Sequence, residues 1–242
     1  MAVPVSLDDR QVDRLRELRA AGASPKSIAR TLGVRPAAVA SWVRRVAAEQ
    51  IAAQPEPPLV GCWVNPGWSE HLTVDGHDDW PDAPPNERSS SGLVGVLVAR
   101  RDRPRRVWVC GYLVDVYCLG VKDVLGPRTM SEDDLPAFRN AFYAAFDDGD
   151  QPVEAPIDLA RELVWGAIAY ARRLGFSPTP EFEQVREHLG DRASERSAIT
   201  FGRDGTPWFI SGPRDNSQSV IRTLTRTAGE GNFHYLVGAP FG

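Results

Sequence analysis

The sequence predicts an α+β protein in which a small unit of three helices precedes a mainly antiparallel sheet domain with helices packed on one face. Three observations predict this class. Apolar residues recur at helical spacing three times within residues 6–50. Beyond residue 92 the expected order is two strands, three helices, two strands, a helix and a strand. Because strands and helices do not alternate regularly there, a Rossmann-type parallel sheet is disfavoured.

Composition excludes several classes of protein. Hydrophobic residues make up 42% and charged residues 25% of the 242 residues, values typical of a globular chain of one or two domains. Three cysteines are too few for a disulfide scaffold and are typical of a reducing compartment. The chain has no run of 18 apolar residues and no secretory signal pattern, so we expect a cytoplasmic protein without a membrane partner.

The charge is divided unevenly along the chain. Residues 1–50 carry nine Lys or Arg and five Asp or Glu; of the totals of 28 and 32, this leaves 19 and 27 for residues 51–242. A basic N-terminal part on an acidic body indicates that the N-terminal part meets an anion. Arginine-rich helices are often merely solvated, so the pattern of apolar residues has to distinguish the two cases.

The N-terminal segment predicts three short helices. The first spans residues 7–20, and the second begins after its cap Ser24, with Pro25 in the first turn. The second ends at Gly33, which suits a left-handed C-terminal position, and the third begins near Pro36. One small core is expected from Ile28, Leu32, Val34, Val39 and Trp42.

Residues 25–44 resemble the helix-turn-helix of bacterial regulators and of the homeodomain-like resolvase and transposase families. The resemblance is carried by Ala29, Gly33 and Val39, which stand at the spacing of the small residue, the turn glycine and the apolar position of those motifs. It implies double-stranded DNA as a partner, with the third helix in the major groove. The alternative is a trihelical unit that serves protein contacts.

Candidate DNA-binding residues follow from that mapping. Arg35, Ser41 and Arg44 would read base edges, while the second helix and Arg45 would contact phosphates. The full set is Ser24, Lys26, Arg30, Arg35, Ser41, Arg44 and Arg45. Since few of these groups read bases, we expect modest specificity and steep salt dependence.

Proline and tryptophan mark the boundary between the two parts of the chain. We assign residues 1–53 to the helix-turn-helix domain, residues 54–92 to a Pro/Trp-rich linker and loop, and residues 93–242 to the α+β domain. Three prolines within residues 55–58 favour an extended spacer. The loop tryptophans are expected to pin their segment onto the core; they are Trp63, Trp68 and Trp80.

The α+β domain opens with an expected antiparallel hairpin of residues 93–99 and 107–121. Three helices follow: one capped by Ser131, one over residues 157–174 that ends at Gly175, and one over residues 180–189. Residues 199–201 and 208–211, joined through 203–206, predict a second hairpin. A helix capped by Ser217 and a strand over 232–237 complete the domain.

The first candidate for chemistry in this domain is an acid within an apolar strand. Asp115 is followed by Lys122 and Asp123 where the strand should end. Two carboxylates and one amine on the same strand could form an acid–base site. The alternative is structural: a buried ion pair or a cap at the sheet edge. On the acid–base interpretation, these three residues are the catalytic candidates.

Metal binding is not predicted. The cysteines form no close pair and the histidines are scattered, so we expect Cys62, Cys110 and Cys118 to be core thiols, the last two on one face of one strand. We expect no metal and no cofactor. Arg214, in a glycine-containing bend before a helix, is a candidate for holding an anionic ligand.

The body as a whole resembles an uncharacterised actinobacterial family of helix-turn-helix domain-containing proteins. The resemblance spans residues 61–237 and is carried by GYLVDVYCLGVKDVLGPR, YARRLGFSPTPEF, FGRDGTPWFISGPRDN and GNFHYLV. It implies a shared fold and a bacterial intracellular setting, and it supplies no catalytic residue. We therefore expect a DNA-binding transcriptional regulator whose body dimerises or senses a small-molecule effector. The alternative is an enzyme acting on nucleic acid or a nucleotide, with the helix-turn-helix as its targeting module.

Overall fold

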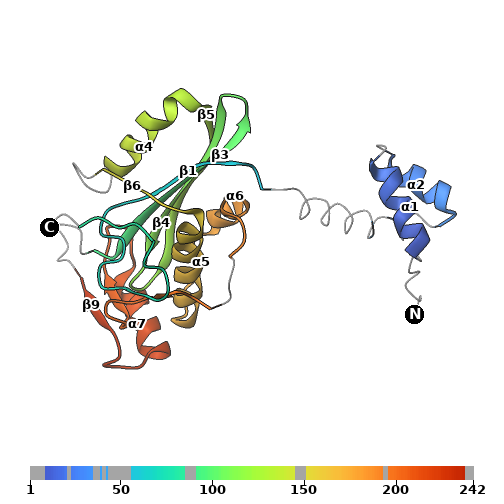
Figure 1. The fold of residues 1–242 in the computed structure, drawn as a ribbon. Helices are drawn as coiled ribbons and strands as arrows, with labels where there is room; N and C mark the ends of the chain where they lie inside the picture. Colours follow the sequence, from blue (N-terminus) through green and yellow to red (C-terminus); the bar gives the residue numbers. More distant parts are fainter. Residues whose placement is uncertain are drawn as a thin grey trace. The chain divides into compact units, whose positions relative to one another are not determined.

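The computed structural model describes residues 9–20, 23–34, 39, 42, 56–84, 91–144, 151–192 and 196–237. The chain divides into two compact units, Met1–Glu56 and Pro57–Gly242, and each is described by itself (Figure 1). Within the described residues, no helix combines the length and apolarity needed to cross a membrane.

The first unit contains helices α1 (Asp9–Ala20) and α2 (Pro25–Leu32). The ends of α2 confirm the sequence prediction: the Ser24 Oγ accepts a hydrogen bond from the Ser27 amide at 3.2 Å, and Pro25 occupies the first turn. Gly33 adopts a left-handed conformation with φ of 66°, which a residue with a side chain adopts only with strain.

Apolar side chains from both helices share a small core in this unit. Leu15 of α1 and Ile28 of α2 are fully buried, and Ala29 of α2 is buried in the same cluster. Val39 and Trp42 are helical residues that pack into the same core. The rest of the expected third helix lies outside the described residues.

The second unit is built on a five-stranded sheet in the order β5-β4-β3-β1-β6, with every neighbouring pair antiparallel. The strands are β1 (Leu59–Val64), β3 (Leu93–Arg103), β4 (Arg106–Asp115), β5 (Gly120–Ser131) and β6 (Val153–Glu154). The prediction of an α+β fold with an antiparallel sheet is confirmed. Strands β1 and β2 (Thr73–Val74) lie inside residues 59–74, so the assignment of 54–92 to linker and loop is corrected.

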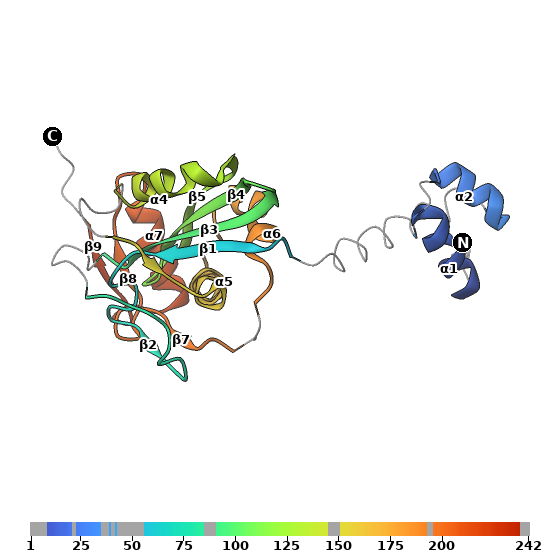
Figure 2. The same cartoon turned by 45° about the horizontal axis from the view of Figure 1, so that its top comes forward.

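Helices cover both faces of this sheet, so the expectation of helices on one face is wrong. Helix α5 (Ile157–Arg173) packs on one face and α4 (Leu135–Ala144) on the other, as Figure 2 shows. The reason lies in the strand period of two: Val96 and Val98 of β3 face α5, while Leu97 and Ala99 belong to the core beneath α4. A run that is apolar at every position has two faces to bury.

The helices that flank the sheet begin and end close to the expected residues. Ser131 caps a 3₁₀ turn, η1 (Glu132–Asp134), that leads into α4, and its Oγ accepts from the Asp134 amide at 3.2 Å. Helix α5 is followed by Gly175 with φ of 88°. The expected helix over residues 180–189 is a 3₁₀ turn, η2 (Pro180–Gln184), followed by the short helix α6 (Arg186–Leu189).

The expected long strand over residues 107–121 is two strands, because the chain turns between Asp115 and Gly120. Gly120 has φ of 72°, and an added Cβ there would lie 2.9 Å from the Ala171 Cβ of α5. Cys110 therefore lies in β4 and Cys118 in the turn, rather than on one strand.

The second expected hairpin does not form. Strand β7 (Ile199–Thr200) pairs with β2, and β8 (Trp208–Ile210) pairs in parallel with β9 (His234–Leu236). The turn over 203–206 is present, but the residues on its two sides donate to the β4–β5 turn instead of to each other: Gly202 N to the Val116 carbonyl and Trp208 N to the Tyr117 carbonyl. Helix α7 (Ser217–Thr227) is capped by Asn216 rather than by Ser217.

Candidate functional site

The exposed face of α2 is cationic. Lys26 and Arg30 are one helical turn apart, both are exposed, and neither forms an ion pair with any described residue. Helix α2 contains no acidic residue. By contrast, α1 carries charges of both signs and pairs Arg14 with Glu17 on its surface.

The structure describes three of the seven predicted DNA-binding residues. Ser24 uses its hydroxyl oxygen to cap α2, which keeps the helix N-terminus ordered, while Lys26 and Arg30 point into solvent. The remaining four, Arg35, Ser41, Arg44 and Arg45, lie outside the described residues.

Asp115 is a buried structural carboxylate. Its side chain is at the end of β4, and its Oδ1 accepts hydrogen bonds from the amides of Tyr117 at 3.0 Å and Cys118 at 2.9 Å. Burial raises the pKa of Asp115 to about 6, although Lys122 and the backbone hydrogen bonds act to lower it. The carboxylate thus shapes the turn between β4 and β5 and is sealed from solvent.

Lys122 and Asp123, the other two catalytic candidates, form ion pairs with one loop. The Lys122 Nζ lies 2.6 Å from the Asp215 Oδ2, and both side chains are largely buried. The Asp123 Oδ2 lies 3.6 Å from the Arg214 Nη1, with both side chains exposed. Lys122 and Asp123 therefore lie at one edge of the sheet, and each pairs with a different residue of the 212–216 loop. The largely buried Lys122–Asp215 pair fastens that loop to β5.

The cysteines and histidines do not converge on a metal centre within the described residues. Cys62, Cys110 and Cys118 are buried free thiols, which confirms the expectation of core thiols, and burial raises the pKa of Cys62 and Cys110 to about 12. His71 pairs with Asp204 at 3.2 Å, whereas His77 stacks on Trp80 with ring centroids 4.0 Å apart.

Among the described residues, two buried charged side chains were not predicted from the sequence. Glu162 of α5 forms a double hydrogen bond with Arg192, with both distances 2.6 Å, and also accepts from the Ser197 hydroxyl and the Ala198 amide. Burial acts to raise the pKa of Glu162, but these donors outweigh it and hold the pKa below its ordinary value. The only signal in the sequence was an acid among the apolar residues of 159–171.

The second such residue is Arg100 of β3, which donates to three backbone carbonyls. Arg100 holds the chain before β1 and the end of α6, and Glu162 holds Arg192 and the chain before β7. A polar groove of ≈ 370 Å³ beside Glu162 is lined by groups of mixed sign, including Asp158, Arg161 and His77.

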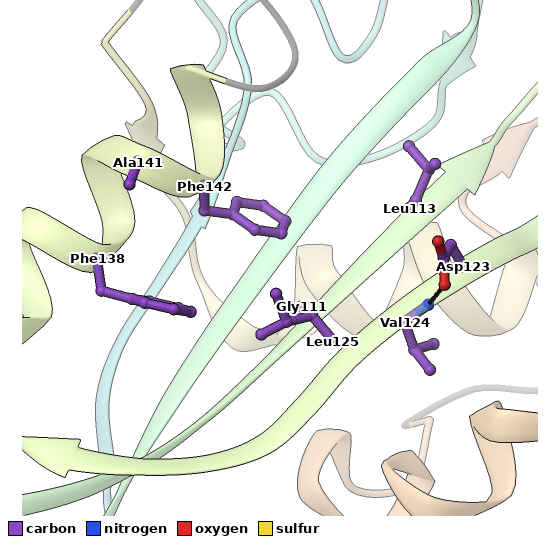
Figure 3. Close-up of a pocket in the computed structure, with 8 residues that line it drawn as sticks. All are labelled: Gly111, Leu113, Asp123, Val124, Leu125, Phe138, Ala141 and Phe142. Atoms are coloured by element: carbon purple, nitrogen blue, oxygen red, sulfur yellow. Dashed lines mark hydrogen bonds between the residues drawn. The ribbon is translucent and has the colours of Figure 1, made fainter.

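An apolar groove of ≈ 430 Å³ lies between α4 and the outer strands β4 and β5. Figure 3 shows Phe138 and Phe142 reaching from α4 toward the strands, with Leu113 and Asp123 at the far end. The lining residues are Gly111, Leu113, Asp123, Val124, Leu125, Phe138, Ala141 and Phe142. This groove was not predicted from the sequence.

Known proteins supply no template for these features. No protein-family model matches the chain, and no curated protein or solved structure is detectably similar to it. A role for the chain has to follow from the chemistry of its exposed faces and grooves.

Proposed function

We propose that this protein binds double-stranded DNA through its N-terminal unit and acts as a transcriptional regulator. The observation that carries this proposal is the face of α2, where Lys26 and Arg30 stand one turn apart without a counterion among the described residues. A short helix that is capped by a side chain and carries only positive charges is suited to contacting a row of DNA phosphates. The core contacts of Val39 and Trp42 are those that a third helix of a helix-turn-helix would make.

In this proposal the two helices of the motif have different tasks. Helix α2 crosses the DNA backbone and contributes phosphate contacts. These contacts position the protein but carry little information about the base sequence. Arg35, Ser41 and Arg44 of the following segment reach base edges in the major groove, where arginine prefers guanine. Replacing Arg44 should therefore relax specificity, while replacing Lys26 should weaken binding to every sequence alike.

The DNA proposal predicts a charge-dependent loss of affinity. We expect Lys26→Ala and Arg30→Ala each to weaken binding of the full chain to a mixed-sequence duplex by roughly 3- to 10-fold at low salt, and to lower the salt slope by about one. Fluorescence anisotropy across a series of salt concentrations measures both quantities. Arg14→Ala is the control, since Arg14 is already paired with Glu17 on α1, and it should change little.

Two outcomes would count against this assignment. If the protein binds no duplex in a salt-dependent manner, the N-terminal unit would instead serve contacts with other proteins. Equal affinity for the wild type and both α2 variants would show that DNA is bound by another surface.

The second unit offers a surface for the dimer that paired half-sites require. Tyr235 and Leu236 of β9 and the adjoining Val237 are exposed by 55%, 61% and 43%, on a strand that pairs only with β8 among the described residues. Residues 233–237 contain no charged residue or proline of the kind that protects an exposed strand edge. Since β9 bonds β8 through His234 and Leu236, the Tyr235 amide points to the open edge, where a second copy of β9 can pair about a twofold axis.

Disrupting that edge is expected to give monomers. Leu236→Lys places a charge at the β9–β9 contact and should shift the protein from dimer to monomer in sedimentation equilibrium. Leu59→Lys is the matched control, because Leu59 is also an exposed leucine, at 42%, but lies on β1. A wild-type monomer at micromolar concentration, or a dimer that survives Leu236→Lys, would rule out β9 as the interface.

A further inference from the structure

The groove beneath α4 has the features of a small-molecule site. The geometry points to a small amphiphilic cation as its ligand, an aliphatic or aromatic molecule that carries one amine. Binding of such a molecule needs no DNA; only its role as the effector of a regulator rests on the proposed function.

The apolar part of the groove is large enough for such a molecule. Its volume of ≈ 430 Å³ falls within the range of small-molecule sites, roughly 300–1,000 Å³. Phe138 and Phe142 form one wall, while Leu113 and Leu125 of neighbouring strands form the other (Figure 3). Gly111 lets these walls approach, because an added Cβ at that position would lie 2.7 Å from the Phe142 Cε2.

The charge at the end of the groove determines whether a cationic or an anionic ligand is favoured. Asp123 is the one ionisable residue among the described residues that line the groove. Its Oδ1 accepts a hydrogen bond from the Val124 amide at 2.9 Å, which fixes the carboxylate at the mouth. A carboxylate ligand would be repelled there, whereas an amine would gain a charge-assisted hydrogen bond.

The present partner of Asp123 can be replaced by a ligand. The Arg214 side chain is 89% exposed and its Nη1 stands 3.6 Å from the Asp123 Oδ2, so this ion pair contributes little. The loop that carries Arg214 is held separately by the buried pair of Lys122 and Asp215. Displacing the Arg214 guanidinium therefore leaves the loop docked.

The aromatic wall also favours a cation. The Arg128 guanidinium already lies 5.5 Å from the centre of the Phe138 ring. Ring faces carry negative partial charge, which explains the Arg128 contact, while the amine of the ligand is held by Asp123 at the other end of the groove.

The test compares three probes that differ only in their head group. Octylamine, octan-1-ol and octanoate are titrated into the full-length protein by isothermal calorimetry below their micellar concentrations. We expect octylamine to bind more tightly than octanol, and octanoate least. Asp123→Asn should weaken octylamine binding about fivefold and leave octanol unchanged. Arg214→Gln should strengthen octylamine binding, because it removes the competing guanidinium.

Two further variants locate the site. Ala141→Phe fills the groove from the exposed side of α4 and should abolish binding of all three probes, with near-ultraviolet circular dichroism confirming the fold. Asp133→Asn, which removes an exposed acid of η1 that does not line the groove, should change nothing. Preference for octanoate, no binding of any probe, or binding that survives Ala141→Phe would overturn the proposal.

The role of the ligand is tested apart from its binding. Anisotropy of a labelled duplex with and without octylamine measures whether the groove controls DNA affinity. If octylamine binds and the duplex does not, the groove assignment stands and the DNA proposal fails. If both bind without influencing one another, the ligand is no effector.

Discussion

Replacing Arg100 by methionine is expected to destabilise the second unit by about 4 kcal/mol, because three buried or partly buried carbonyl groups lose their donor together. Arg100 is 3% exposed. Its Nε donates to the His188 carbonyl at 2.6 Å, its Nη1 to Pro57 at 2.8 Å and its Nη2 to Leu189 at 3.3 Å. A loss of that size is a large fraction of the stability of a typical domain, about 5–15 kcal/mol.

The geometry of the guanidinium group explains why no smaller donor replaces it. Its fork joins the chain just before β1 to the end of α6, two segments distant in sequence. A lysine ammonium is a single point of donation and cannot reach all three carbonyls from the same Cβ. Arg100→Lys is therefore expected to recover less than half of the loss.

Urea denaturation followed by tryptophan fluorescence measures this effect, since Trp63, Trp68 and Trp80 are buried in the same unit. Arg103→Met is the matched control: this side chain is 73% exposed and pairs only weakly, with Asp102 at 3.6 Å, so its loss should stay below about 0.5 kcal/mol. A similar midpoint for both variants would show that the buried hydrogen bonds of Arg100 do not hold the unit together.

Local signals in the sequence identified most helix ends. Ser24, Gly33, Ser131 and Gly175 act through their own backbone or a neighbouring amide, so a single sequence contains the whole interaction. The antiparallel pairing of β3 with β4 was likewise predictable, because the connection between them is short. These features depend on residues close together in the chain.

Features that depend on distant partners were not predictable. The break at Asp115 arises because its carboxylate binds the amides of the following turn, yet the surrounding residues are as apolar as a strand. The hairpin expected after residue 199 fails because Gly202 and Trp208 donate to that same turn, which comes more than 80 residues earlier in the chain. Asp123 and Arg214 were both singled out, but their pairing across the sheet edge was not, since nothing in the sequence links β5 to the 212–216 loop.

The buried Asp115 and the half-buried His188 are expected to give the folded state opposite responses to pH. Burial raises the pKa of Asp115 from 3.8 to about 6, so its contribution to stability is fully present below pH 3.8 and is lost as the pH rises through 6. Burial lowers the pKa of His188 from 6.5 to about 4, so its contribution is present above pH 6.5 and is lost as the pH falls toward 4. Each effect amounts to about 2–3 kcal/mol between pH 4.5 and 7.5. In the wild type the two nearly cancel.

Single substitutions should separate the two effects. Asp115→Asn keeps an oxygen that accepts from the Tyr117 and Cys118 amides but carries no charge, so this variant should become more stable as the pH rises from 4.5 to 7.5. His188→Gln keeps a donor for the Val98 carbonyl and should become less stable over the same interval. Urea midpoints at five pH values measure how the stability of the wild type and of the two variants changes with pH. The other carboxylates contribute equally to the pH dependence of all three proteins.

The double variant provides the decisive comparison, because Asp115→Asn with His188→Gln removes both titrations and should restore the flat profile of the wild type. Asp115→Ala supplies the complementary control: it removes the charge and also the acceptor, so it should lower stability at every pH, by about 2 kcal/mol or more. Parallel slopes for the two single variants would mean that neither group titrates as its surroundings require. A steep wild-type profile that both variants preserve would instead place the pH dependence in the exposed carboxylates.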